Sequence, residues 1–87
     1  MRKHVKIYCD YFGIGEQDFP LCEWCCHNRA VDVHHIEPRG RGGKNPKVDV
    51  IENLMGLCRE CHQLAEAKLI SKEKLQEIHE QKLKDSE

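Results

Sequence analysis

Two pairs of cysteines have the spacing of metal ligands. Cys22 and Cys25 form one Cys-x-x-Cys pair, Cys58 and Cys61 form a second, and 32 residues separate the two pairs. A two-residue gap lets a tight turn direct both thiolates at one ion, and four thiolates complete the tetrahedral shell of a structural zinc site. The spacing therefore predicts one structural Zn²⁺ on these four cysteines. Cys26 is an alternative partner for Cys22, with a three-residue gap.

Other interpretations of the cysteines are weaker. A redox Cys-x-x-Cys motif is typical of a single pair in a βαβ context, whereas this chain has two pairs around a glycine-rich segment. We expect Cys9 to be a small buried apolar side chain, and His27 to be exposed, although His27 could serve as a spare ligand. A four-thiolate shell leaves no open coordination position, so any reaction must use other residues.

Residues with ligand and base chemistry lie between the cysteine pairs and directly after the second pair. They stand in three stretches: Asp32-Val33-His34-His35-Ile36-Glu37-Pro38-Arg39-Gly40, then Glu52-Asn53-Leu54, then Cys58-Arg59-Glu60-Cys61-His62. In this order, the double histidine, the glycine-rich segment, the Asn-Leu pair and the Cys-x-x-Cys-His resemble the HNH endonuclease motif in its zinc-ribbon form. The resemblance covers residues 21–67. Because several independent elements coincide, it is more specific than any one of them.

The resemblance implies a small α+β zinc-stabilised domain with a ββα-metal core and flanking helices. It implies that His34 and His62 bind the catalytic divalent cation, which is Mg²⁺, Mn²⁺ or another divalent ion. His35 would be the general base that activates water, and Asn53 would either orient this base or contact the metal. Some relatives carry a further histidine one helical turn later. Here that position is Glu66, which could be a carboxylate ligand but is more simply a solvated side chain.

These residue types suit phosphodiester hydrolysis on chemical grounds. The reaction needs an activated water and stabilisation of the charge on the phosphate, which a neutral imidazole and a metal ion can supply. Histidine has an unperturbed pKa of about 6.5, so much of it is neutral at pH 7. Adjacent side chains of a regular strand point to opposite faces, so His34 and His35 cannot share one site without a distortion at the strand end. The alternative is that one of the two is functional and the other is packed.

A local basic stretch suits contacts with nucleic acid. Arg39, Arg41, Lys44 and Lys47 lie within nine residues that contain no acid. Arginine side chains and backbone amides can bind phosphate, so Arg39, Arg41 and Lys44 are the predicted nucleic-acid contacts. The simpler interpretation is a solvated loop, and for Lys47 that is sufficient.

The elements that position these residues can be predicted in outline. Residues 3–12 fit both a strand and one face of a helix, and Gly13 directly afterwards favours the helix, because glycine commonly ends one. A connector then runs to Pro20. Residues 30–36 are rich in β-branched side chains and predict a strand, which Pro38 interrupts.

The second half of the chain is expected to be mainly helical. Residues 53–57 form a short segment that leads into the second cysteine pair. A helix should begin at this pair and run through His62 to about Lys68. Ser71 is a candidate N-cap for a further helix. The apolar stripe of that helix would be formed by Leu75, Ile78 and Leu83.

Length and composition limit the class of protein. The chain has 87 residues, of which 39% are hydrophobic and 33% charged, and six are cysteines. A chain of this size buries only about 60% of its unfolded surface, so a metal site is a reasonable source of added stability. No apolar run approaches the roughly 20 residues that span a bilayer, and no signal-peptide pattern follows the N-terminus. We therefore expect a cytoplasmic protein without a membrane segment.

The sequence supports one main hypothesis and one alternative. The main hypothesis is a metal-dependent HNH endonuclease that cuts DNA, with weak sequence preference and nicking as the expected mode. Its organisation would be an N-terminal flanking segment (1–20), a zinc-ribbon HNH core (21–68) and a C-terminal amphipathic helix (69–87). The alternative is a non-catalytic zinc-ribbon module that binds nucleic acid or protein. The net charge of −1 argues against binding by bulk positive charge, and the oligomeric state is open.

Overall fold

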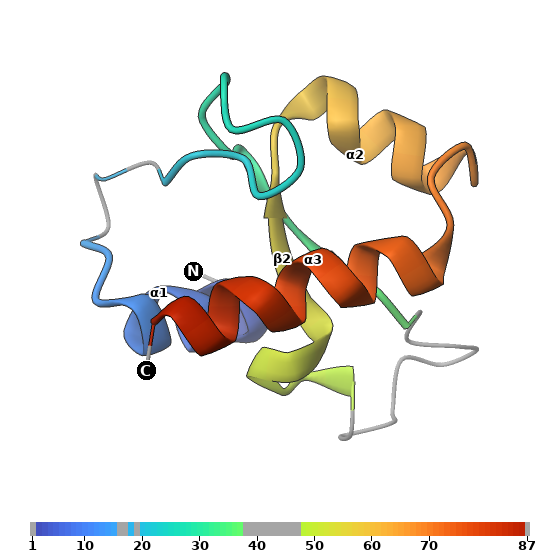
Figure 1. Cartoon of the computed structure of the whole chain (residues 1–87). Helices are drawn as coiled ribbons and strands as arrows, with labels where there is room; N and C mark the ends of the chain where they lie inside the picture. The colour runs from blue at the N-terminus through green and yellow to red at the C-terminus, as the bar shows by residue number, and fades with distance from the viewer. Residues whose placement is uncertain (1, 16–17, 19, 38–47, 87) are drawn as a thin grey trace.

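The centre of the fold is an antiparallel pair of strands that leads into a helix. In the computed structural model, which describes residues 2–15, 18, 20–37 and 48–86, β1 (Asp32–His35) pairs with β2 (Leu54–Leu57). After β2 and Cys58, α2 (Arg59–Glu66) begins, and the helices lie around the strand pair (Figure 1). This order of strand, strand and helix confirms the predicted small α+β fold with a ββα core and flanking helices.

The two strands have different surroundings. All four residues of β2 are buried, whereas those of β1 are exposed or half-buried. His34 pairs with Met55 and His35 with Leu54. Within the described part of the chain the sheet contains only β1 and β2, so β1 has one edge that no strand covers. Side chains from both faces of β1 can therefore approach a molecule that lies across this edge.

The first helix confirms the helical interpretation of residues 3–12. α1 (Lys3–Phe12) ends at Gly13, which has φ 65° and whose N–H bonds to the carbonyl oxygen of Cys9. His4 and Tyr8 are its buried residues, one turn apart. This face of α1 packs against β1 and β2, and the competing strand pattern is overridden.

The second helix ends earlier than predicted. α2 stops at Glu66 instead of Lys68, because Lys68 has a left-handed backbone with φ 61°. The amide of Leu69 then bonds back to the carbonyl of Leu64 over 2.9 Å, which closes the helix end.

The third helix, α3 (Lys72–Asp85), begins as predicted. The Ser71 hydroxyl accepts a hydrogen bond from the amide of Lys74 over 3.2 Å. Leu75 is buried, and Ile78 packs against the core. The fully buried residue one turn after Leu75 is His79, which the predicted apolar stripe did not include.

The strand boundaries also differ in detail from the sequence prediction. The predicted strand 30–36 is shorter as β1, and the segment 53–57 consists of the end of the 3₁₀ turn η3 (Ile51–Asn53) followed by β2. Single backbone bonds extend the pairing at both ends, from the Val31 amide to Leu57 and from the Ile36 amide to Asn53. The glycine-rich segment 38–47 lies outside the described residues.

The hydrophobic core is built around the cysteines. Cys22, Cys58 and Cys61 belong to one buried cluster that also contains Met55 and Leu75. The core thus includes a residue of α3, beyond the predicted boundary at 68, and the division into three segments stays a prediction. Among the described helices, none has the length and apolar character needed to cross a membrane.

A buried polar network joins three parts of the chain to the first cysteine pair. The Glu23 carboxylate accepts hydrogen bonds from Tyr8 Oη, from the Gly56 amide over 2.9 Å and from His79 Nδ1 over 2.7 Å. His79 Nε2 donates to the carbonyl of Ile51 over 2.6 Å. Because both ring nitrogens of His79 face acceptors, the ring is an imidazolium paired with Glu23.

Burial would lower the pKa of His79, but the hydrogen bond and charge of Glu23 and the Ile51 carbonyl outweigh it, so the pKa is raised. Burial and the neighbouring Glu23 carboxylate raise the pKa of Tyr8, which remains a neutral donor.

Candidate metal centres and active site

The four predicted cysteine ligands come together in one cluster. The Sγ atoms of Cys22, Cys25, Cys58 and Cys61 all lie within 4.8 Å of one another, and Cys25 and Cys58 are 3.9 Å apart. A tetrahedral zinc with Zn–S bonds of about 2.3 Å separates its sulfurs by about 3.8 Å. All four are free thiols. The donor set and spacing therefore fit one Zn²⁺, which these cysteines would hold as a closed structural site.

A tight turn forms the first half of the cysteine cluster. The Cys22 amide bonds to the Asn28 carbonyl over 2.8 Å, and the Cys26 amide bonds to the Cys22 carbonyl over 3.0 Å. Backbone amides of Asn28 and His27 lower the pKa of Cys25 to about 6, which favours the thiolate that a metal requires.

Burial has the opposite effect on two other ligands, because it raises the pKa values of Cys22 and Cys61. A cation between the sulfurs would offset this cost.

The remaining cysteines and His27 lie outside the cluster. Cys26 is exposed, with φ 58°, and its thiol points at the Glu23 carbonyl, so the structure places Cys25 and not Cys26 with the other ligands. Cys9 is only half-buried, less than expected. His27 is exposed, as expected.

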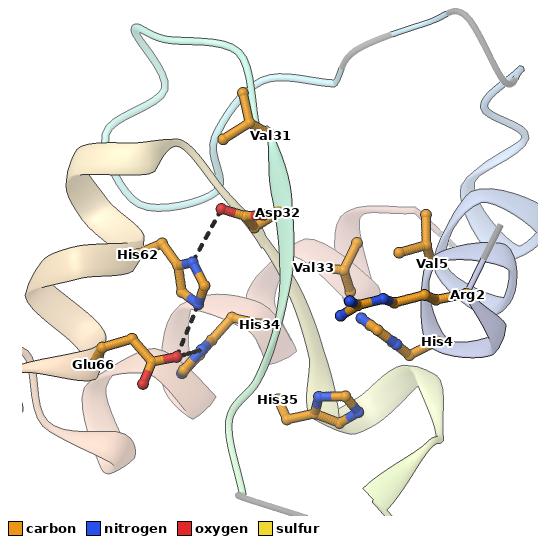
Figure 2. Close-up of a pocket in the computed structure, with 10 residues that line it drawn as sticks. All are labelled: Arg2, His4, Val5, Val31, Asp32, Val33, His34, His35, His62 and Glu66. Carbon is orange, nitrogen blue, oxygen red and sulfur yellow. Dashed lines mark hydrogen bonds and ion pairs between the residues drawn. The ribbon is translucent and has the colours of Figure 1, made fainter.

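A second cluster of possible ligands joins β1 to α2. Ligand atoms of His34, His62 and Glu66 lie within 4.8 Å of one another. Glu66 Oε1 is 3.0 Å from His62 Nε2 and 3.8 Å from His34 Nδ1, as the dashed lines in Figure 2 show. The structure thus brings together the two histidines proposed from the resemblance. The Glu66 side chain is largely exposed, as the simpler interpretation expected, and its carboxylate also lies beside both rings.

Asp32 completes the surroundings of His62. Its Oδ2 atom lies 3.1 Å from His62 Nδ1, on the opposite side of the ring from Glu66 (Figure 2). A carboxylate that accepts the Nδ1 proton orients the ring and leaves Nε2 as the metal-binding nitrogen. Burial and the nearby charge of His62 lower the pKa of His34, which keeps that imidazole neutral. Two imidazoles and one carboxylate suit several divalent cations and leave positions for water and substrate.

His35 points to the other face of β1. In Figure 2 it lies on the side of His4, while His34 lies on the side of His62 and Glu66. The regular strand keeps this alternation, so the distortion expected at the strand end does not occur. The imidazole rings of His4 and His35 are 4.7 Å apart between centroids.

A carboxylate fixes the proton of His35. Its Nε2 atom lies 2.8 Å from Asp49 Oδ1, and both side chains are mostly buried. Because a carboxylate can only accept, Nε2 carries the hydrogen, and in the neutral ring Nδ1 holds the lone pair. This tautomer leaves one ring nitrogen able to take a proton.

Both faces of β1 nevertheless open into one cavity. The cavity has a volume of about 600 Å³, and it is lined by His34, His35, His62 and Glu66 together with residues of α1. The uncovered edge of β1 lies between the two histidines, so a substrate across this edge could meet both of them. No contortion of the strand is needed.

Asn53 has a structural position. Its Oδ1 atom accepts a hydrogen bond from the Glu37 amide over 2.7 Å, and its Nδ2 donates to the carbonyls of Glu37 and Val48. These bonds use both amide hydrogens and tie together the residues that flank segment 38–47. Asn53 therefore does not reach the histidine cluster through these bonds. It holds Val48, the neighbour of Asp49, and so supports the partner of His35.

Some predicted site residues lie outside the described part of the chain, and the sequence prediction missed two residues that contact the site histidines. Arg39, Arg41 and Lys44 lie outside the described residues. Asp32 could have been found from the sequence, because residues two apart on a strand share a face and Asp32 stands two before His34. Asp49 carried no such signal, since its position opposite His35 depends on tertiary structure.

The fold and the clusters define a ββα domain with two separate groups of side chains that could hold a metal ion. The family model described as HNH endonuclease matches residues 20–68, which is more than half of the chain. The protein belongs to the HNH endonuclease family. Comparisons with curated proteins and with solved structures gave no match.

Proposed function

We propose that this chain is a metal-dependent endonuclease that hydrolyses DNA phosphodiester bonds. The observation that carries the proposal is the meeting of His34, His62 and Glu66 in the cavity that His35 also lines. The first three would hold the divalent cation, Mg²⁺, Mn²⁺ or another. The four cysteines would hold a structural Zn²⁺.

The chain's own residues can perform the proton transfer. His35 Nδ1 would accept a proton from the attacking water, because its Nε2–H is committed to Asp49. The Asp49 carboxylate then stabilises the imidazolium that results. When bound, the divalent cation would stabilise negative charge on the phosphate and on the leaving oxygen.

A plasmid assay tests this function. Supercoiled DNA is incubated with the zinc-loaded protein and a panel of divalent cations, and nicked and linear products are measured over time. Removal of a general base should slow cleavage by about 10²- to 10⁴-fold in His35→Ala. The matched control is His27→Ala, which changes an exposed histidine outside the cavity and should cut like wild type. Equal inactivity of wild type and His35→Ala with every cation would contradict the proposal.

The alternative is a zinc-stabilised module that binds nucleic acid or protein without cutting it. The cysteine cluster is compatible with this alternative. A non-catalytic module gives no role to the convergence of His34, His62 and Glu66, or to the Asp49 contact that fixes the tautomer of His35. The geometry therefore favours the enzyme.

A further inference from the structure

Two cavities meet at the candidate active site. The cavity of about 600 Å³ extends from the histidines toward the start of α1. A second cavity, of about 450 Å³, extends in the other direction to the turn between α2 and α3. His34, His35 and Glu66 line both. The two cavities are therefore neighbours at β1, and together they are here called the β1 track.

A cationic side chain stands toward each end of the β1 track. Arg2 lines the first cavity and Lys68 the second, and both residues are exposed. In the described part of the chain neither side chain makes an ion pair. Lys72, which also lines the second cavity, differs because its ammonium is bound to Glu37 over 2.7 Å. Arg2 and Lys68 are therefore the cations of the track with charge available for a ligand.

The backbone of Lys68 is unusual for a residue with a side chain. Its φ of 61° lies in the left-handed region, at a helix end where glycine is preferred. Residues held in such conformations carry a cost in stability and are concentrated at functional sites. A lysine at this position directs a cation to the track at the expense of backbone strain.

The centre of the track is rich in carboxylates. Asp32 and Glu66 line the first cavity, and Asp49 is bound to His35. A polyanion that approaches these groups needs positive charge outside the catalytic cluster. Such charge is present on both sides of it.

We infer that a nucleic-acid strand lies along the β1 track and that Arg2 and Lys68 bind backbone phosphates on opposite sides of the phosphate that is cut. This inference rests on the proposed function and adds the direction of the substrate across the strand. It also gives Arg2, the N-cap of α1 and outside the matched residues 20–68, a part in substrate binding.

Salt-dependent DNA binding tests the inference without any cleavage. The zinc-loaded full chain with His35→Ala is titrated into a fluorescently labelled DNA duplex at several salt concentrations, and anisotropy gives the affinity. Each lost phosphate contact should reduce the slope of log K against log salt by about 0.9. Arg2→Gln and Lys68→Gln should each show this reduction together with weaker binding. Lys84→Gln, at the far end of α3, removes the same charge from outside the track and should change neither quantity.

Lys68→Gly separates the loss of charge from damage to the fold. Glycine accepts the left-handed backbone, so the unfolding midpoint should not fall, while the salt slope should drop as in Lys68→Gln. Unchanged slopes in the Arg2 and Lys68 variants, or no DNA binding at all, would overturn the inference.

The outcomes distinguish this inference from the proposed function. Reduced salt slopes in the variants, combined with a wild-type protein that never cuts DNA, would support DNA binding along the β1 track and contradict the nuclease function. DNA cleavage by the wild-type protein, combined with unchanged salt slopes in the variants, would support the nuclease function and contradict DNA binding along the β1 track.

Discussion

At His62 and His35, the carboxylate that touches each ring determines which nitrogen carries the proton. Asp32 accepts from His62 Nδ1, and Asp49 accepts from His35 Nε2. Under the proposed function, the first contact would leave His62 Nε2 for the metal, and the second would leave His35 Nδ1 for the proton. His34 and His35, neighbours on one strand, thus face different surroundings, with His34 on the side of His62 and Glu66 and His35 on the side of His4.

Asp32→Ala tests the role assigned to this carboxylate. Loss of a group that orients a metal-binding histidine typically weakens metal affinity about 10- to 100-fold. We expect this loss for the divalent cation at His34, His62 and Glu66, measured by titration of the zinc-loaded protein, with the zinc content unchanged. Glu60→Ala, an exposed acid on α2, is the control and should retain wild-type affinity. An Asp32→Ala protein with the affinity of wild type would show that Asp32 does not act on this site.

At the scale of elements, the contact between α1 and β2 depends on a glycine. A Cβ atom at Gly56 would lie 2.8 Å from Tyr8 Oη and 3.1 Å from Tyr8 Cζ. Tyr8 cannot move away freely, because its hydroxyl is bound to the buried Glu23 carboxylate. The strand therefore needs glycine at this position for the helix to approach.

Gly56→Ala should destabilise the protein by about 1–3 kcal/mol, the usual cost of forcing an extra group into a packed core. Denaturant unfolding of the zinc-loaded protein measures this change. In a Tyr8→Phe background the hydroxyl is absent, and the same substitution should cost less. An equal cost in both backgrounds would mean that the clash with Tyr8 Oη is not the cause.

The helices and two of their ends could be predicted from local signals, while the end of α2 and the tertiary contacts could not. Gly13 and Ser71 marked the end of α1 and the start of α3. The sequence prediction placed the end of α2 too late, because Lys68 adopts a left-handed backbone conformation that is not expected of a lysine. Among the site residues, the cysteine spacing and the His34–His62 pairing agreed with the structure. Asp49 owes its position opposite His35 to a tertiary contact that no local pattern encodes, whereas the contact between Glu66 and His62 follows from their spacing of one helical turn.

At the scale of the whole molecule, a buried polar network joins three elements beside the first cysteine pair. Glu23 lies next to Cys22 and bonds with residues of α1, β2 and α3. His79, at the end of this network, is buried and paired with Glu23 as an imidazolium. The fold is therefore held by a charged network as well as by the apolar core and the cysteine cluster.

The raised pKa of His79 predicts a definite pH dependence. A pKa that is higher in the folded state gives stability that is complete below the unfolded value of about 6.5 and is lost as pH rises through the folded pKa. This group should therefore lower the free energy of unfolding by at most about 1.4 kcal/mol per pH unit in that window.

Denaturant unfolding of the zinc-saturated protein above pH 6.5 measures this dependence, and the difference between wild type and His79→Gln isolates it from that of zinc binding. His79→Gln should be less stable than wild type and should lack the pH-dependent contribution of His79 to the free energy of unfolding. The His27→Gln control should retain this contribution. Parallel pH profiles for wild type and His79→Gln would contradict the assigned charge.

The central claim is that a catalytic cation binds at His34, His62 and Glu66, apart from the zinc of the cysteines. Its most direct test is a titration of Mn²⁺ into protein that retains one zinc per chain after mild chelation, with ion binding and plasmid nicking measured over the same concentrations. We predict one added Mn²⁺ per chain, and a nicking rate that rises with its occupancy. In His62→Ala both should be lost while the zinc is retained. A wild-type protein that binds no second ion, or a His62→Ala protein that binds Mn²⁺ and nicks DNA as wild type does, would contradict the account.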